Sequence, residues 1–181
     1  WAEGLAMSAY GVSFGVRVSE RGLWDRIEPL LLPGWTTATT SQVDQMYSLV
    51  VRGASYELFR DAERIAEHDD LALVLDALKS EIRLWVAEHS PQRVFVHAGV
   101  VEWHGRAIIV PGRSYSGKST LIAELLKAGA TYYSDEFAVL DDEGRVHPFA
   151  LPLSIREAGQ TQSTPASASS FGAPTGREPI P

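Results

Sequence analysis

The sequence predicts an α/β protein in two parts, an α+β segment over residues 1–90 and an α/β core over residues 91–181. Three observations lead to this prediction. Runs rich in aromatic and β-branched residues, typical of strands, occur repeatedly between residues 6 and 60. One long stretch with helical periodicity covers residues 70–88. After residue 91, short apolar runs flank a glycine-rich loop that leads into a second helical pattern.

The N-terminal part begins with strand-like sequence. Residues 6–18 predict one or two strands, and residues 47–60 predict a β-hairpin that turns at Gly53. Between them, residues 20–32 suggest a short helix, whose second half is weakened by Pro29. A small α+β arrangement follows from these elements.

Residues 70–88 carry the clearest helical pattern of the sequence. Asp69 stands where an N-cap belongs, and Pro91 lies just past the predicted end. The apolar stripe, which predicts packing in a core or an interface, consists of Leu71, Val74, Leu75, Leu78, Ile82, Trp85 and Val86.

The second part begins with two short apolar runs. Residues 93–101 and 106–110 predict buried strands joined by a turn at His104 and Gly105. Residues 118–128 then predict a helix with Gly129 at its C-terminal end, where glycine readily takes the left-handed conformation of a helix stop.

The rest of the sequence predicts strands and then a polar segment. Residues 131–134 and 137–140 read as strands, followed by an acidic hairpin turn at residues 141–144 rather than a second metal site. From residue 157 the composition shifts to Gln, Thr, Ser, Ala, Gly and Pro. We therefore expect a loop or disordered tail over residues 157–181.

Composition excludes several classes of protein. The protein has a formal net charge of -7 and no cysteine, so disulfides and thiolate metal sites are ruled out. An acidic balance disfavours a broad face for nucleic acid or for a membrane surface. No segment reaches the roughly 18 apolar residues that a spanning helix needs. We expect a cytoplasmic protein that binds no nucleic acid and has no membrane span.

The motif that carries chemistry lies at residues 112–119. It matches G-x-x-x-x-G-K-[ST] at every fixed position and stands between a predicted strand and a predicted helix. The glycines let successive backbone N–H groups point into one concavity, and the helix N-terminus adds a partial positive charge. Lys118 supplies a cation for the β- and γ-phosphates, and Ser119 supplies a hydroxyl for Mg²⁺.

This segment, called the P-loop below, therefore predicts binding of ATP with Mg²⁺, and GTP stays open as the nucleotide. The structural alternative, a serine- and glycine-rich turn, would need neither the Gly-Lys-Ser triplet nor the helix behind it. The expected nucleotide-binding residues are Gly112, Arg113, Ser114, Tyr115, Ser116, Gly117, Lys118, Ser119 and Thr120.

An acidic pair, Asp135 and Glu136, follows the P-loop helix in the sequence. A carboxylate at the end of a neighbouring strand can hold Mg²⁺ directly or through water, and it can deprotonate an attacking hydroxyl. We assign the metal to Ser119 and Asp135, against the alternative of a solvated turn. His97 interrupts an apolar run, where a histidine is more often a core or sheet-edge residue than a catalyst.

The run from His97 to Glu136 resembles the catalytic core of the HPr serine kinase/phosphorylase family and its stand-alone, HPr-kinase-related members. His97-Ala-Gly-Val-Val is similar to the histidine-containing strand of that family, and its separation from Lys118 is as expected there. The P-loop also matches, and Tyr133-Ser-Asp135-Glu136 resembles the paired acidic motif of the family.

The resemblance implies a fold like that of phosphoenolpyruvate carboxykinases, a mixed α/β core distinct from the Ras-type sheet. It also implies roles for four catalytic residues. His97 and Lys118 would line the active site, while Asp135 and Glu136 would supply metal binding and the base.

The sequence departs from the family in ways that limit what the resemblance implies. Glu136 stands where the family usually has Asp, and Thr120 where the bifunctional enzymes carry Glu. The motif linked to phosphorolysis is not recognisable in residues 150–181, and residues 1–90 do not match the N-terminal domain of those enzymes. We therefore carry over neither the phosphorylase reaction nor HPr as substrate. We expect the core to continue beyond residue 181, so that the sequence is incomplete at its C-terminal end.

The expected function is that of an ATP- and Mg²⁺-dependent kinase that transfers the γ-phosphate to a hydroxyl of a protein or peptide. By the resemblance, the acceptor is a serine. Two alternatives stay open, a nucleotide-binding regulatory module without transfer and a P-loop ATPase or GTPase. No N-K-x-D motif for base recognition is present, which ranks the second alternative lower. A homo-oligomer is left open.

Overall fold

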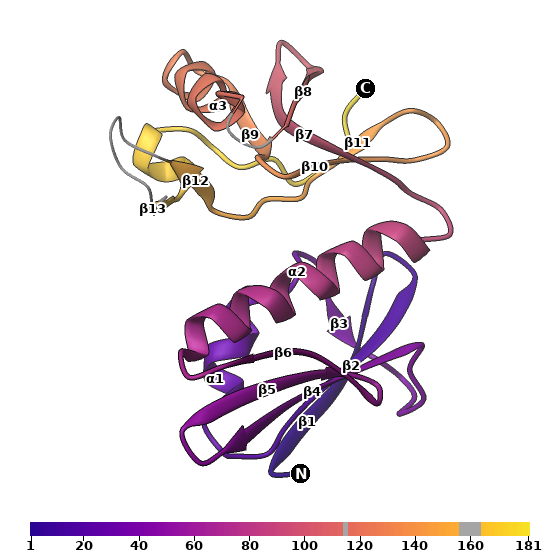
Figure 1. Cartoon of the computed structure of the whole chain (residues 1–181). Coiled ribbons are helices and arrows are strands. Elements are labelled where there is room, and N and C mark those ends of the chain that lie inside the picture. The colour runs from indigo at the N-terminus through magenta and orange to yellow at the C-terminus, as the bar shows by residue number, and fades with distance from the viewer. Residues whose placement is uncertain (114–115, 156–163) are drawn as a thin grey trace. The chain divides into compact units, whose positions relative to one another are not determined.

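The computed structural model describes residues 1–113, 116–155 and 164–181. The protein forms two compact units, Trp1–Pro91 and Gln92–Pro181 (Figure 1). Along the sequence, the division falls one residue after the boundary expected at residue 90. Among the helices in the described ranges, none combines the length and the apolar character needed to cross a bilayer.

The Trp1–Pro91 unit is built on one six-stranded sheet in the order β3-β1-β2-β4-β5-β6. Neighbouring strands run antiparallel except β2 and β4, which are parallel. Residues 6–18 form two strands and residues 47–60 lie in a hairpin, as predicted, while β3 and β6 were not foreseen. The strands are β1 (Glu3–Ala9), β2 (Val12–Val18), β3 (Thr36–Thr37), β4 (Gln45–Arg52), β5 (Ser55–Arg60) and β6 (Glu63–His68).

Helix α2 (Leu71–His89) lies across this sheet (Figure 1). Five residues of its predicted apolar stripe are buried, namely Val74, Leu75, Leu78, Ile82 and Val86. The N-cap prediction is wrong by one residue. Asp70, not Asp69, caps the helix, because its carboxylate accepts the N–H of Ala72 at 2.9 Å.

The short helix expected over residues 20–32 is shorter than predicted. It consists of α1 (Trp24–Ile27) and the 3₁₀ turn η1 (Glu28–Leu30). Pro29 lies in the first turn of η1, where its missing N–H costs nothing. The proline thus ends the α-helix as the sequence indicates.

The Gln92–Pro181 unit has a five-stranded sheet, and every pair in it is antiparallel. Its main order is β11-β10-β7-β8, and β9 also pairs with β7. The predicted strands of residues 93–101, 106–110, 131–134 and 137–140 are all present. The strands are β7 (Val94–Trp103), β8 (Arg106–Pro111), β9 (Thr131–Ser134), β10 (Phe137–Leu140) and β11 (Val146–His147).

Strands β9 and β10 follow one another along the same edge of β7. Ser134 is opposite Val100 and Phe137 is opposite His97, so only Asp135 and Glu136 lie at the break between the two strands. Interruptions of a ladder commonly re-aim side chains near functional sites. The acidic pair therefore sits in the sheet edge rather than on a hairpin turn.

Helix α3 (Lys118–Lys127) packs on one face of this sheet. Its buried Ile122 and Leu126 meet Val101 of β7 and Leu153 in one apolar cluster. Gly99 allows this approach, because a Cβ at that position would lie 2.6 Å from Cγ1 of Ile122. The opposite face carries a second cluster around Ala98, Val100, Tyr133, Ala138 and Val146.

Residues 164–181 are packed in the unit, and beside two short regular elements most of this stretch has the irregular loop structure that the sequence predicts. It contains β13 (Thr164–Ala166), paired with β12 (Leu153–Ile155), and the 3₁₀ turn η2 (Ala168–Phe171). Ala168 and Ala173 are buried against α3 and β9. The small alanine side chains, which in the sequence suggested a tail, are the ones that fit into this close packing. Residues 156–163 lie outside the described residues.

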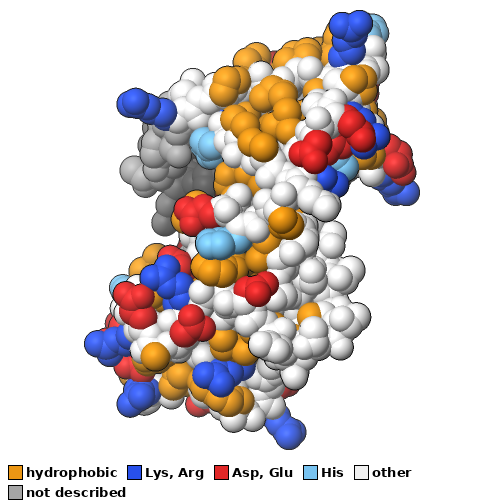
Figure 2. Space-filling model, turned by 90° about the vertical axis from the view of Figure 1, so that its right-hand side faces the viewer, with side chains coloured by type: hydrophobic (Ala, Val, Ile, Leu, Met, Phe, Trp, Pro, Cys, Tyr) orange, Lys and Arg blue, Asp and Glu red, His pale blue; other side chains and the backbone are white. Residues whose placement is uncertain are grey.

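The last residues also join the sheet. Ile180 exchanges backbone hydrogen bonds with Val146, and Ala107 of β8 donates to the carbonyl of Pro181 at 2.7 Å. Several apolar side chains of β7 and β8 nevertheless stay exposed, among them Val94 and Ile109. Figure 2 shows hydrophobic side chains gathered on one side of this unit.

The contact between Gly99 and Ile122 gives a stability prediction. Gly99→Ala should destabilise the protein by about 1–3 kcal/mol, since the new methyl group meets a buried, β-branched side chain that cannot move aside. Urea unfolding followed by circular dichroism measures the change.

Gly15→Ala is the matched control. Its Cβ would also lie 2.6 Å from a neighbour, but that neighbour is the flexible Cε end of Met46, so the loss should be smaller. Adding Ile122→Ala, which removes Cγ1, to Gly99→Ala should make the double variant more stable than the sum of the two single changes predicts. An unaltered unfolding midpoint for Gly99→Ala would contradict the packing described.

Candidate functional site

The P-loop connects the end of β8 to the start of α3, the strand–loop–helix order that the motif requires. Gly117 has φ +88° and occupies the N-cap position, and the helix begins at Lys118. At Gly112 a Cβ would lie 2.6 Å from Oγ of Ser116, so the loop closes tightly over this position. Ser114 and Tyr115, two of the predicted nucleotide-binding residues, lie outside the described residues.

Lys118 points back into its own loop. Its side chain is buried, and Nζ donates to the carbonyl oxygens of Gly112 at 2.7 Å and Arg113 at 3.0 Å. A third contact joins Nζ to Nε2 of His97 at 3.1 Å. Because an ammonium group can only donate, Nε2 of His97 is the acceptor in this contact.

His97 reaches this position from β7. Its backbone is paired with Phe137, and the two rings form a T-shaped pair with centroids 6.0 Å apart. The side chain is exposed rather than buried in a core. The structure therefore brings His97 to the P-loop lysine, 21 residues away in the sequence.

Ser119 and Asp135 form the second contact of the site. Oγ of Ser119 donates to Oδ2 of Asp135 at 2.7 Å, and the backbone N–H of Ser154 donates to the same oxygen at 3.2 Å. The other carboxylate oxygen, Oδ1, is buried and accepts no hydrogen bond from any described group. A buried carboxylate oxygen without a donor is suited to receive a proton or to contact a hydrated cation.

The electrostatics of Asp135 follow from its burial. Desolvation raises the pKa of this carboxyl above its ordinary value, and the hydrogen bonds from Ser119 and Ser154 and the charge of Lys118 oppose that rise only in part. A carboxyl whose pKa is raised is a better proton acceptor than one at its ordinary value.

Ser134 fixes the orientation of the acidic pair. It is fully buried, and its Oγ accepts the N–H groups of Glu136 at 3.1 Å and Phe137 at 3.0 Å. The carbonyl of Glu136 accepts the N–H of Ala98 in β7 at 3.1 Å. The backbone on both sides of Asp135 is thus held, and the half-buried Glu136 lies next to it at the sheet edge.

The structure brings five of the predicted site residues together. His97, Lys118, Ser119 and Asp135 make direct contacts, and Glu136 adjoins them. The side chains of Arg113 and Ser116 are exposed at the loop, and Thr120 is exposed in the first turn of α3. Ser154 was missed, and no sequence signal could have found it, because it approaches Asp135 through its backbone.

No group of three or more His, Cys, Asp or Glu side chains suited to a metal occurs in the described ranges. Mg²⁺ is commonly held by one or two protein oxygens together with substrate phosphates and water, so such a group is not required. The hydroxyl of Ser119 and the carboxylate of Asp135, which are hydrogen-bonded to one another, fit that kind of site.

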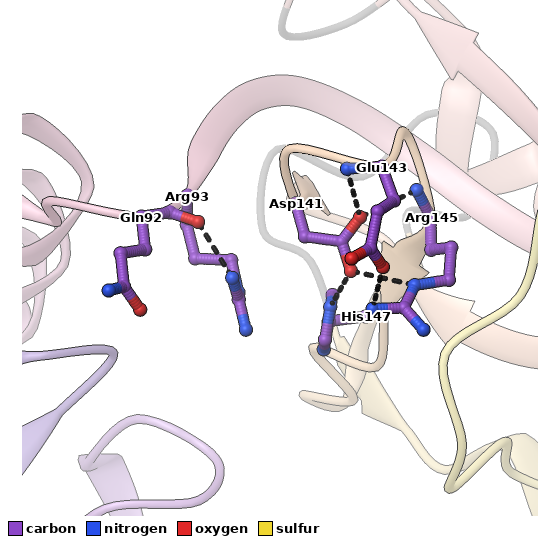
Figure 3. A network of polar contacts seen from close by, with 6 residues as sticks. All are labelled: Gln92, Arg93, Asp141, Glu143, Arg145 and His147. Atoms are coloured by element: carbon purple, nitrogen blue, oxygen red, sulfur yellow. Dashed lines mark hydrogen bonds and ion pairs between the residues drawn. The ribbon is translucent and has the colours of Figure 1, made fainter.

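A second polar cluster lies at the turn after β10 (Figure 3). Oδ2 of Asp141 accepts Nε2–H of His147 at 2.8 Å and Nε–H of Arg145 at 2.9 Å, and Oδ1 accepts the backbone N–H of Glu143 and Arg145. The hydrogen bond from His147 is the main reason that the pKa of Asp141 lies below its ordinary value. These contacts all close the turn, which supports the structural interpretation made from the sequence.

Two other features lie apart from the P-loop. A hollow of about 380 Å³ is lined at the C-terminal end of α3 by Glu102, Trp103, His104, Ala128 and Gly129. The guanidinium of Arg93 donates to the carbonyl of Gln92 at 2.7 Å (Figure 3). Both features involve residues outside the P-loop and the acidic pair.

Comparisons of the sequence and the structure with protein-family models, with curated proteins and with solved structures find no significant match. The antiparallel, strand-rich unit is therefore described by its own geometry, and the HPr-kinase-like and phosphoenolpyruvate-carboxykinase-like fold expected from the sequence stays a prediction.

The cluster around Asp141 gives a prediction about pH. Asp141→Asn should lower the urea midpoint at pH 7, since the charged acceptor of three donor residues is lost. A carboxyl whose folded-state pKa is depressed stabilises the protein above its unfolded value of about 3.9, and this contribution disappears as the pH falls through the folded value. The difference from the wild type should therefore shrink steadily below about pH 4.

Asp142→Asn is the control, because Asp142 is exposed in the same turn. It should leave the midpoint close to that of the wild type at every pH. Equal midpoints for Asp141→Asn and the wild type at pH 7 would contradict a stabilising role for the cluster.

Proposed function

We propose that the Gln92–Pro181 unit binds ATP with Mg²⁺ at the P-loop and transfers the γ-phosphoryl group to a hydroxyl of a protein or peptide. The observation that carries this proposal is the hydrogen bond between Ser119 and Asp135 beside the buried Lys118. It unites a cation, a metal-binding hydroxyl and a buried carboxylate at the N-terminus of one helix.

Lys118 supports phosphate binding by its charge and its position. Its ammonium now donates to two loop carbonyls, which are neutral and weaker acceptors than phosphate oxygens. Phosphate oxygens in the loop would take over these hydrogen bonds, and the N-terminus of α3 would add its dipole. His97 would keep the ammonium oriented, since its Nε2 is already an acceptor for Nζ.

Ser119 and Asp135 support the metal and the proton transfer. The hydroxyl of Ser119 would ligate Mg²⁺, and Oδ2 of Asp135 would orient that hydroxyl and a metal-bound water. Bound Mg²⁺ would neutralise charge on the β- and γ-phosphates. Oδ1 of Asp135, which is buried and accepts from no described donor, would take the proton of the attacking hydroxyl. Glu136 would add negative charge beside it.

The serine specificity of the acceptor rests on the resemblance to the HPr kinase family stated above. A regulatory module without transfer is the second candidate function. The departures from the family pattern at Thr120 and Glu136 favour it.

The decisive experiment mixes the protein with γ-labelled ATP, Mg²⁺ and serine-containing acceptor peptides. Label on a peptide supports the kinase, label in inorganic phosphate alone selects an ATPase, and calorimetric binding without turnover selects the regulatory module. Absence of any heat with Mg·ATP would overturn the proposal.

Lys118→Ala should reduce phosphoryl transfer by at least about 100-fold, the usual effect of removing one charge-stabilising donor. Lys118→Met preserves the length of the stem and should lose as much. Lys127→Ala is the matched control, because Lys127 ends the same helix and is exposed beside Glu124. Both variants of Lys118 are compared with the wild type by thermal unfolding, and transfer retained by a folded variant would contradict the role.

Asp135→Asn should separate function from stability. The raised pKa means that the ionised carboxylate is less favourable in the folded than in the unfolded protein, a penalty present above the unfolded pKa. The nucleotide-free variant should therefore melt no lower than the wild type at pH 7, while transfer falls by about 10²–10⁴-fold. Normal transfer, or a melting temperature far below that of the wild type, would count against this assignment.

A further inference from the structure

We propose that Ser154 is a phospho-acceptor on this protein itself, modified in cis by the site that Asp135 and the P-loop form. The inference rests on the proposed kinase function and adds a substrate to it. It follows from a contact that could not be predicted from the sequence, the hydrogen bond from the backbone N of Ser154 to Oδ2 of Asp135.

Ser154 and Ser119 are hydrogen-bonded to the same atom, Oδ2 of Asp135. Oδ2 of Asp135 accepts both Oγ–H of Ser119 at 2.7 Å and N–H of Ser154 at 3.2 Å. Ser119 is the residue that would hold the metal on the terminal phosphates. The backbone N of Ser154 therefore lies against the same carboxylate oxygen as the hydroxyl that would hold the metal.

The strand that carries Ser154 is anchored on the P-loop helix. Leu153, its neighbour in β12, is fully buried and packs in the cluster that contains Ile122 and Leu126 of α3. Successive side chains of a strand point to opposite faces, so the burial of Leu153 turns the side chain of Ser154 outward. Ser154 is accordingly exposed.

The pairing of β12 leaves the N–H of Ser154 free to face Asp135. Its partner in β13 is Pro165, which has no N–H to donate. In an antiparallel pair of strands, residue pairs that are joined by backbone hydrogen bonds alternate with pairs that are not. The pair of Ser154 and Pro165 is of the second kind, and its neighbours, Leu153 with Ala166 and Ile155 with Thr164, are of the first. The N–H of Ser154 points away from β13, toward the carboxylate.

The chemistry balances without any further reactant. Oγ of Ser154 attacks the γ-phosphorus of ATP, and the bond from that phosphorus to the bridging oxygen of the β-phosphate breaks. ADP leaves with the electron pair of this bond, and the hydroxyl proton passes to the carboxylate of Asp135. Such a step requires an exposed hydroxyl and a carboxylate oxygen able to accept, and Oδ1 accepts from no group in the described ranges.

The test incubates the whole protein with γ-labelled ATP and Mg²⁺ and adds no acceptor. We expect up to one label per molecule, located at Ser154 by peptide mass spectrometry, with a first-order rate that does not change when the protein is diluted tenfold. Ser154→Ala should abolish the label, and Ser154→Thr should yield phosphothreonine at residue 154. Ser169→Ala, which removes another exposed serine of this unit, should label like the wild type.

Three outcomes would overturn the inference. These are label at a different residue, a rate proportional to protein concentration, and no label on a wild-type protein that binds Mg·ATP and phosphorylates an added peptide. The last outcome leaves the proposed function standing. A wild-type protein that shows neither heat with Mg·ATP nor transfer to any acceptor removes both proposals together.

Discussion

The hydrogen bond between Ser119 and Asp135 is the interaction on which the candidate site depends. It joins the first turn of α3 to the break between β9 and β10, 16 residues further along the sequence. It also uses one oxygen of a carboxylate whose second oxygen is buried and accepts from no donor in the described part of the protein. A site of this kind is less stable than an apolar one of the same shape, which is typical of positions kept for chemistry rather than for folding.

The geometry around this bond is set by the apolar packing beneath it. Gly99 lets Ile122 approach β7, and this approach places the N-terminus of α3 beside the sheet edge that carries the acidic pair. Ser134, buried under the pair, holds the backbone of Glu136 and Phe137. The polar groups therefore need little rearrangement to face a common ligand, and preorganised donors and acceptors contribute more to catalysis than mobile ones.

Much of the fold could be predicted from local sequence signals. The helix of residues 71–89 follows from its apolar period, and Gly129 ends α3 in the left-handed conformation that glycine favours. Local sequence signals did not predict the segments whose structure depends on tertiary contacts. Ala168 and Ala173 sit in a polar, proline-rich stretch, yet close packing against α3 buries them. The short strand β6 is polar and pairs only because β5 offers its edge.

In the candidate site, too, some residues could be predicted from local sequence signals and others could not. Lys118 and Ser119 belong to one motif with a fixed meaning, and Asp135 was suggested by its place after a strand. The contact of His97 with Lys118 depends on the side of β7 that faces the loop, which one sequence does not determine. Ser154 could not be predicted, because a backbone N–H carries no residue-specific signal.

The contacts of Lys118 have a consequence for which ligands the loop would bind. The ammonium is already satisfied by two carbonyls and an imidazole, so an incoming molecule must compete for it instead of meeting an unsolvated charge. A ligand with several negative oxygens offers better acceptors than the neutral carbonyls that it would displace. A nucleoside without phosphates offers only neutral acceptors in their place. Under the proposed function, Lys118 would therefore favour ligands that carry several phosphate groups.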